Sequence, residues 1–271
     1  MTSPRGRAPA GSLRVAYDDV GSGPPLVFVH GGLGNREMWA PQVRALSATH
    51  RCIAYDLRGH GETEGGEEVE AFTPALLRDD LLALADALGL ARFALVGLSV
   101  GGLVAQEAAI AAPERLSAVV MADTWVVTGG SERERQAGRA LTPVVEGALR
   151  VLGTGPLAYL AARGMGDRDE EARELVRAAT SGTDRGAAIR VWRGLAAHDT
   201  RSRLPQVATP ALVIAGARDR NLAQARLLAS LVQDSELVIL PDAGHITNLH
   251  QPARFTAAVA DFLSRRSPTG R

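Results

Sequence analysis

The pentapeptide Gly97-Leu98-Ser99-Val100-Gly101 places a serine where the chain changes direction. An apolar run precedes it and a helical pattern from Gly102 to Ala111 follows it, which predicts a sharp turn between a strand and a helix. Such a turn holds the serine in a sparsely populated backbone conformation, and the flanking glycines leave room for both elements. The same pattern also arises by chance in a chain with 29 glycines. We expect the Ser99 hydroxyl to face solvent as a nucleophile.

A serine hydroxyl attacks at neutral pH only when an imidazole accepts its proton and a carboxylate orients that imidazole. His245 is the expected base because it follows the apolar run 237–240 in a loop and has a glycine directly before it. Asp219 is the expected carboxylate because it follows the run 211–215 and a short turn. Since the carboxyl ends of parallel strands meet at one edge of a sheet, these side chains should lie near Ser99.

The partners of Ser99 have alternatives in the sequence. Asp219 could instead cap the helix that follows it, because aspartate favours helix starts. Asp123 also follows an apolar run and could reach the same imidazole. The remaining histidines have less telling positions: His30 in a glycine loop, His50 and His60 in polar turns, His198 at the end of a helical region and His250 at a helix start.

The oxyanion of a tetrahedral intermediate needs preorganised N–H donors. The backbone N–H of Val100, directly after the serine and at a helix start, offers one donor. The loop His30-Gly31-Gly32-Leu33-Gly34 is expected to offer the second, from Gly32 first and from Leu33 as the alternative. We expect the side chain of His30 to hold this loop by a hydrogen bond.

Short apolar runs alternate along the chain with longer stretches of helical spacing. Near-continuous apolar runs are typical of strands buried on both faces, so we expect an α/β fold with a mostly parallel sheet and helices on each side. In the helix expected after Thr73, leucines recur at helical spacing until Gly89. The expected strands are 13–17, 26–29, 52–55, 93–96, 118–121, 211–215 and 237–240.

The strand pattern stops between Trp125 and about Thr209, where helical segments are separated by glycine-rich breaks. We interpret residues 125–209 as a helical cap inserted into one core domain, which comprises residues 1–124 and 210–271. A separate small helical domain is the alternative. We favour the cap because strands resume at Ala211.

Composition removes several classes of protein. The chain has 30 basic and 30 acidic residues, so no long-range field attracts nucleic acid or an anionic membrane. Every basic residue is arginine, which excludes a lysine Schiff base and a phosphate-loop lysine. The single cysteine, Cys52, is expected to be a core thiol. With no stretch of ~20 apolar residues and no leader pattern, we expect a cytoplasmic location.

Together, these motifs resemble the α/β-hydrolase fold superfamily, with matches spread from Leu26 to Phe262. His30-Gly31-Gly32 resembles the oxyanion loop, and the segment 97–102 resembles the nucleophile elbow. The segment 56–61, Asp-Leu-Arg-Gly-His-Gly, resembles a turn that is usually structural in that family, and Gly244-His245 resembles the histidine loop. We expect the helical cap to follow the sixth strand of this fold, and its sequence departs from the pattern of the family. Segments 97–102 and 245–252 most resemble 3-oxoadipate enol-lactonases and related small carboxylic-ester hydrolases.

We therefore expect a serine hydrolase that cleaves a small carboxylic ester or lactone through an acyl-enzyme, without a metal or a cofactor. Alternatives on the same fold are a lyase, a cyclase, a cofactor-free haloperoxidase-like enzyme or a receptor for a small molecule. Neither nucleic acid nor a membrane is expected as a partner, and a homodimer is left open. Candidates for the substrate pocket are Leu33, Trp39, Trp125 and Trp192, although the tryptophans also suit core packing. Arg36 and Arg193 are candidates for contact with a substrate carboxylate or for solvated surface charges.

Overall fold

The computed structural model describes residues 5–129, 132–156, 170, 183–196 and 198–266. An eight-stranded sheet forms its centre, in the order β1-β2-β4-β3-β5-β6-β7-β8. The strands are β1 (Arg5–Ala10), β2 (Leu13–Val20), β3 (Pro25–Val29), β4 (Arg51–Tyr55), β5 (Phe93–Leu98), β6 (Leu116–Ala122), β7 (Ala211–Gly216) and β8 (Ser235–Leu240). The pairs β1–β2 and β2–β4 are antiparallel, and all other pairs are parallel. The expected α/β fold with a mostly parallel sheet is confirmed.

Each expected strand is present, and β1 is an additional strand that the apolar pattern did not indicate. Its sequence, Arg-Gly-Arg-Ala-Pro-Ala, buries only Ala8 and Ala10 fully. Arginine and proline are residues that proteins place on exposed sheet edges. The strand was missed because an edge strand with one short buried face lacks a continuous apolar run.

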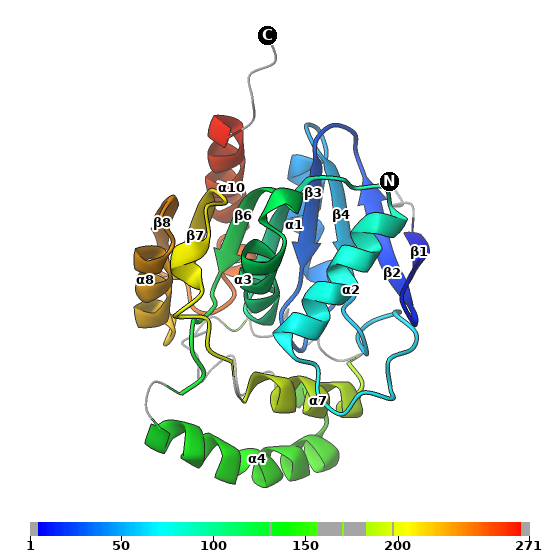
Figure 1. The fold of residues 1–271 in the computed structure, drawn as a ribbon, viewed down its shortest axis with the longest axis vertical. Coiled ribbons are helices and arrows are strands. Elements are labelled where there is room, and N and C mark those ends of the chain that lie inside the picture. The colour runs from blue at the N-terminus through cyan, green and yellow to red at the C-terminus, as the bar shows by residue number, and fades with distance from the viewer. Residues whose placement is uncertain (1–4, 130–131, 157–169, 171–182, 197, 267–271) are drawn as a thin grey trace.

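Helices cover both faces of the sheet (Figure 1). They are α1 (Ala40–Leu46), α2 (Pro74–Ala87), α3 (Val100–Ala111), α4 (Glu132–Leu152), α7 (Arg185–Leu195), α8 (Leu222–Leu231), α9 (Thr247–His250) and α10 (Pro252–Arg266), with 3-10 turns at Arg36–Trp39, Pro113–Arg115 and Leu204–Gln206. One buried cluster joins the sheet to α2, α3 and α8, and a second joins it to α1 and α10. Among the described helices, none combines the length and the apolar character needed to cross a bilayer.

Alternation along the strands explains the two clusters. Val27 and Val29 of β3 point into the first cluster, whereas Leu26 and Phe28 point into the second. Successive side chains of a strand face opposite sides, so a fully apolar strand supplies both layers. Cys52 lies in the second cluster, where burial raises the pKa of its thiol to about 12. The expectation of a core thiol is confirmed.

Helix α2 follows its sequence signals closely. The Thr73 side chain accepts a hydrogen bond from the backbone N–H of Leu76, which caps the first turn. Leu77, Leu81 and Leu84 are buried against the sheet, and Gly89 adopts a positive φ of 68° just after the helix. The predicted cap, apolar face and glycine stop are all confirmed.

Close packing between α3 and β3 leads to a stability prediction. A Cβ atom on Gly101 would lie 2.1 Å from the backbone oxygen of Val29. Because a sheet backbone cannot move aside, Gly101→Ala should lower the free energy of unfolding by about 3 kcal/mol. At Gly147 in α4, the same atom would meet nothing within 4 Å, so Gly147→Ala should raise stability by about 0.5–1 kcal/mol. Urea denaturation of both variants checks this, and equal effects would contradict it.

The segment between β6 and β7 lies beyond the carboxyl end of β6, as Figure 1 shows for α4 and α7. Its described residues contain helices and one isolated bridge between Val127 and Asp199. At this bridge the outgoing and returning chains pair, because Thr128 N–H donates to His198 O and Thr200 N–H donates to Val126 O. The glycine-rich breaks that the sequence predicts between Trp125 and Thr209 include residues 164–166 and 182, which lie outside the described residues.

Candidate active site

The turn that carries Ser99 lies between β5 and α3 and is strained. Ser99 has φ 57° and ψ −114°, a conformation that side chains rarely adopt. A Cβ atom on Gly97 would lie 2.0 Å from the backbone oxygen of Gly101, so the two ends of the turn touch. The expected elbow is therefore present, and its glycines are required by contact between the strand and the helix.

His245 connects Ser99 to Asp219. The Oγ atom of Ser99 lies 3.0 Å from Nε2 of His245, and Oδ2 of Asp219 lies 3.0 Å from Nδ1. An ionised carboxylate can only accept, so Nδ1 carries the hydrogen and Nε2 is left to accept the Ser99 proton. The arrangement is one in which an imidazole can remove a proton from the serine.

Burial and a further hydrogen bond hold this arrangement in place. His245 is 3 % exposed and Asp219 is 5 % exposed. The second carboxylate oxygen of Asp219 accepts from the backbone N–H of Asn221 at 2.8 Å, which fixes the carboxylate between β7 and α8. Low solvent access strengthens the interaction between the carboxylate and an imidazolium formed during a reaction.

Asp123 is close to the same imidazole but has other partners. Its Oδ2 accepts from the backbone N–H and the hydroxyl of Thr247, at 2.8 and 2.7 Å. Its Oδ1 accepts from the backbone N–H of Gly216 at 3.3 Å. Burial and the nearby charge of Asp219 raise the pKa of Asp123 well above its ordinary value. Asp123 therefore ties together the loops that carry His245 and Asp219, while Asp219 contacts the ring.

The glycine loop after β3 lies beside the elbow. A Cβ atom on Gly31 would be 3.5 Å from Cβ of Ser99, and one on Gly32 would be 2.6 Å from Cγ2 of Val100. Val100 is the first residue of α3, where helix N–H groups have no partner within the helix. The two expected donor residues, Gly32 and Val100, are thus neighbours in space. Side chains larger than hydrogen have no room at Gly32.

His30 holds the start of this loop, as its position predicts. The backbone N–H of Leu57 donates to Nε2 of His30 at 3.0 Å, so the ring hydrogen is on Nδ1 and donates to Gly31 O at 2.7 Å. Burial and the neighbouring His60 lower the pKa of His30 to about 3, so the ring is neutral. A neutral ring with these two partners fits a structural role.

A sequence profile of the alpha/beta hydrolase fold matches residues 24–252. The chain belongs to the alpha/beta hydrolase fold family. It is 31% identical over 246 residues to 3-oxoadipate enol-lactonase 2 of Acinetobacter baylyi, covering 89% of each chain. It is 29% identical to the putative carbamate hydrolase RutD of Agrobacterium fabrum, covering 88% of this chain and 93% of that protein. The crystal structure of the enol-lactonase from Burkholderia xenovorans LB400 has a TM-score of 0.80 and 30% identity, covering 96% of this chain and 100% of that one.

Because the chain belongs to this family and is similar to an enol-lactonase and a putative carbamate hydrolase, it is an enzyme of the hydrolase class. The enol-lactonase resemblance inferred from the motifs is confirmed by both the sequence relative and the solved structure.

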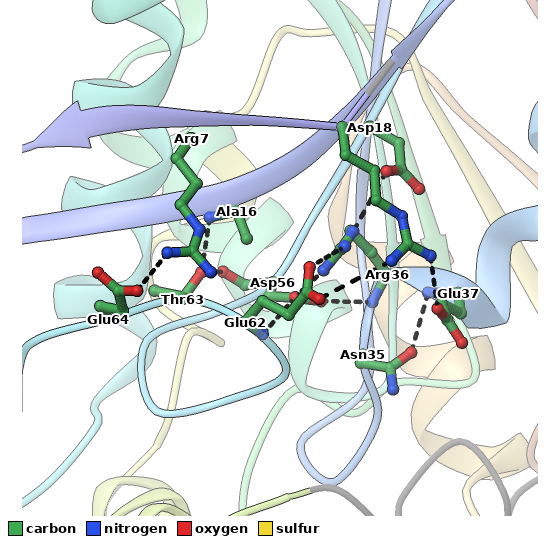
Figure 2. Close-up of polar contacts among 11 residues, drawn as sticks. Arg7, Ala16, Asp18, Asn35, Arg36, Glu37, Asp56, Glu62, Thr63 and Glu64 are labelled. Atoms are coloured by element: carbon green, nitrogen blue, oxygen red, sulfur yellow. Dashed lines mark hydrogen bonds and ion pairs between the residues drawn. The ribbon is translucent and has the colours of Figure 1, made fainter. Parts of the chain in front are cut away.

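Arg36 in this alpha/beta hydrolase has a role that the sequence did not indicate. It is 4 % exposed and pairs with Asp18, Asp56 and Glu62. The carboxylate of Asp56 accepts hydrogen bonds from the backbone N–H groups of Arg36 and Glu62 (Figure 2). Burial alone would lower the pKa of Arg36, but the charge of Asp56 and the hydrogen bond to Glu62 raise it above its ordinary value. We expected Arg36 either to contact a substrate carboxylate or to be a solvated surface charge, and both expectations are wrong. The side chain is buried, and its guanidinium group is paired with three carboxylates of the protein.

Arg193 is also engaged, although it is partly exposed. Its Nε donates to Glu146 of α4 at 2.7 Å, and its Nη1 lies 3.1 Å from Glu70. These contacts join α7 to α4 and to the segment before α2. Arg193 is thus paired with protein carboxylates, which makes it a link between elements.

The proposed pocket residues lie in different surroundings. Trp39 is fully buried between Phe28 and Phe255, with ring centroids 5.2 and 6.0 Å apart, so it packs in the core. Trp125 is half-buried and donates to Thr128 Oγ1 at 2.9 Å.

Leu33 and Trp192 contact the segment between β6 and β7. Leu33 is half-buried against Leu149, Ala188 and Ile189. Trp192 is 38% exposed, and its Nε1–H lies 3.4 Å from Thr142 Oγ1. Leu33 therefore connects the glycine loop to α4 and α7, and Trp192 lies where α7 meets α4.

Proposed function

We propose that this chain cleaves a small carboxylic ester or lactone with Ser99 as nucleophile, His245 as general base and Asp219 as its orienting carboxylate. The observation that carries this proposal is the placement of one imidazole at 3.0 Å from both the serine oxygen and the carboxylate oxygen. The relatives named enol-lactonase support an ester-type substrate. The alternative of a receptor for a small molecule would not need this proton path, whereas a haloperoxidase-like enzyme on the same fold could use it.

The reaction follows from the positions of these groups. Ser99 Oγ attacks the substrate carbonyl carbon while Nε2 of His245 takes its proton, and the N–H groups of Gly32 and Val100 bind the oxyanion. The imidazolium then protonates the leaving alcohol, which in a lactone remains attached to the acyl group. A water molecule gives a proton to Nε2 as its oxygen attacks the acyl-enzyme. Collapse of the second oxyanion breaks the bond between the acyl carbon and Ser99 Oγ, Oγ takes the proton back from Nε2, and the carboxylic acid is released.

We also propose that residues 125–209 act as a cap over this site. Support comes from Thr183 Oγ1, which donates to Leu33 O at 2.8 Å, and from Val191 of α7, whose Cγ1 would lie 3.1 Å from a Cβ atom on Gly32. The base of the cap is fastened to α3, because Gln106 donates to Trp125 O and accepts from Thr200 Oγ1. A cap in this place would enclose the acyl group beside the oxyanion donors.

The pH dependence of the reaction follows from the base. An unperturbed imidazole has a pKa of ~6.5, and a protonated Nε2 cannot accept the Ser99 proton. We expect kcat/KM to rise through near-neutral pH and to fall tenfold per pH unit on the acidic side. A profile measured from pH 5 to pH 9 checks this, and a rate that stays constant down to pH 5 would argue against an imidazole base.

Two assays test the proposed function directly. The purified protein should hydrolyse p-nitrophenyl acetate and should be labelled by a fluorophosphonate probe at Ser99. A panel of short esters, simple lactones and a carboxylated enol-lactone then identifies the substrate class. A protein that neither turns over any ester nor reacts with the probe would exclude nucleophilic catalysis and favour a binding role.

A further inference from the structure

The loop that carries the proposed Gly32 donor has little means of holding its own shape. Three of the residues at 31–34 are glycines, and glycine backbones lose the most conformational freedom on folding. Gly32 has no room for a side chain, since a Cβ atom would lie 2.6 Å from Val100 Cγ2. Contacts from another part of the chain must therefore fix the loop.

The segment 56–60 after β4 supplies these contacts along the whole loop. At the start, Leu57 N–H donates to Nε2 of His30 at 3.0 Å. At the end, the backbone N–H of Arg36 donates to Asp56 Oδ1 at 2.8 Å. In the middle, Nε2 of His60 lies 2.9 Å from the carbonyl oxygen of Gly32. His60 thus contacts the carbonyl of Gly32, the residue whose N–H is a proposed oxyanion donor.

The ring of His60 faces two carbonyl oxygens, which creates a choice of tautomer. Its Nε2 is 2.9 Å from Gly32 O, and its Nδ1 is 2.9 Å from Arg58 O. Burial lowers the pKa of His60, against the hydrogen bonds to these two carbonyls, which raise it. A neutral ring has one hydrogen, so it donates to one carbonyl and turns a lone pair toward the other.

We propose that His60 is a positioning residue for the oxyanion hole, which donates from Nε2 to the Gly32 carbonyl and so fixes the Gly32–Leu33 peptide. The inference rests on the proposed function of Ser99. His60 holds the peptide that follows Gly32, which is trans like every described peptide bond. His30 acts in the same way on the Gly31 carbonyl and thereby directs the N–H of Gly32.

The two histidines therefore orient two successive peptides, one each. Their rings lie 5.2 Å apart between centroids, on the side of the loop where the two carbonyls point. Because these two peptides lie on either side of Gly32, holding both fixes the φ and ψ angles of Gly32 and therefore the direction of its N–H. Loss of the His60 bond should thus weaken oxyanion binding more than substrate binding.

The support beneath His60 is itself rigid, as a positioning role requires. Arg58 donates from Nε and Nη2 to the carboxylate of Asp80 in α2, at 2.6 Å each. Gly59 has a φ of 71°, and a Cβ atom there would lie 2.7 Å from Ala187 of α7. The turn that carries His60 is therefore packed between α2 and α7.

Two amide variants separate the two bonds of the ring. In His60→Gln the amide nitrogen reaches about as far as Nε2, so it can still donate to Gly32 O. In His60→Asn the amide reaches only as far as Nδ1, so it keeps the contact with Arg58 O and loses the contact with Gly32 O. Thermal unfolding of both variants shows that they are folded before any rate is compared.

We expect His60→Asn to lower kcat for p-nitrophenyl acetate by about 10²-fold with KM within about threefold, and His60→Gln to retain activity within about tenfold. Binding of a trifluoromethyl ketone, which forms an oxyanion on Ser99, should weaken in the Asn variant by the same factor as kcat. Equal effects of the two variants, or a change in KM alone, would overturn the inference. If the wild-type protein itself neither hydrolyses esters nor reacts with a fluorophosphonate, the proposed function fails first.

The tautomer gives a second measurement that does not depend on turnover. Nitrogen-15 NMR of the imidazoles in the folded protein should show His60 with its hydrogen on Nε2 and His30 with its hydrogen on Nδ1. A His60 ring with its hydrogen on Nδ1 would donate to Arg58 and not to Gly32. That result would overturn the positioning role even in an active enzyme.

Discussion

Ser99→Ala should lower kcat by ~10⁶ if the three side chains act as one unit. Without Oγ no acyl-enzyme forms, and the residual rate comes only from oxyanion stabilisation and substrate binding. The alanine methyl group fits the elbow, because the strain at Ser99 arises from the backbone and its glycine neighbours. The measurement is single-turnover and steady-state hydrolysis of the best ester in the panel.

A matched serine variant separates loss of the nucleophile from damage to the fold. Ser264 is exposed near the end of α10, where its hydroxyl donates to Asp261 O at 2.8 Å. Ser264→Ala should leave kcat and fluorophosphonate labelling unchanged. Covalent catalysis would be refuted by a cleanly purified Ser99→Ala protein that keeps wild-type turnover.

Asp219→Asn should lower kcat by ~10⁴ while leaving the fold intact. The carboxylate accepts from Nδ1 of His245 and from the backbone N–H of Asn221, whereas an amide nitrogen facing the ring favours the tautomer with its hydrogen on Nε2. In that tautomer the ring cannot take the Ser99 proton. The amide also supplies no charge to stabilise the imidazolium.

Asp123→Asn is the matched comparison, since it removes the other buried carboxylate near the same ring. An amide oxygen can still accept from Thr247, and only the weaker contact with Gly216 N–H at 3.3 Å is lost. We expect kcat to fall by no more than about tenfold, with a reduced melting temperature. The roles would be reversed if Asp123→Asn proved far more damaging to kcat than Asp219→Asn.

The choice between these two carboxylates shows the limit of sequence reasoning at this site. Asp123 directly follows β6 and Asp219 follows β7 after a short turn, so both were candidates from their positions at strand ends. Residues that meet at this site are distant in sequence: Asp123 and Thr247 are 124 residues apart, and Ser99 and His245 are 146 apart. A local pattern shows that a residue lies near the end of a strand. The direction in which its side chain points depends on how the neighbouring loops pack.

Elements with strong local signals were predictable for the opposite reason. Short-range patterns include the N-terminal capping residue and the leucine spacing of α2, the apolar runs of the strands and the glycines of the elbow. Each of these patterns corresponds to the element observed. The edge strand β1 was not predicted, because its buried face consists of only two alanines. Core packing was anticipated for Trp39, but its aromatic neighbours were not, because they come from a strand and from the C-terminal helix.

The sequence by itself determined the order in which a nucleophile, a carboxylate and a histidine follow one another along an α/β chain. Turns and apolar periodicity are patterns of neighbouring residues, so they can be recognised without the fold. Only the tertiary structure decided that Arg36 forms ion pairs with three carboxylates and that His60 contacts the carbonyl of Gly32. The physical reason is that hydrogen bonds and ion pairs have ångström-scale geometry. Such geometry exists only after segments far apart in the chain are packed together.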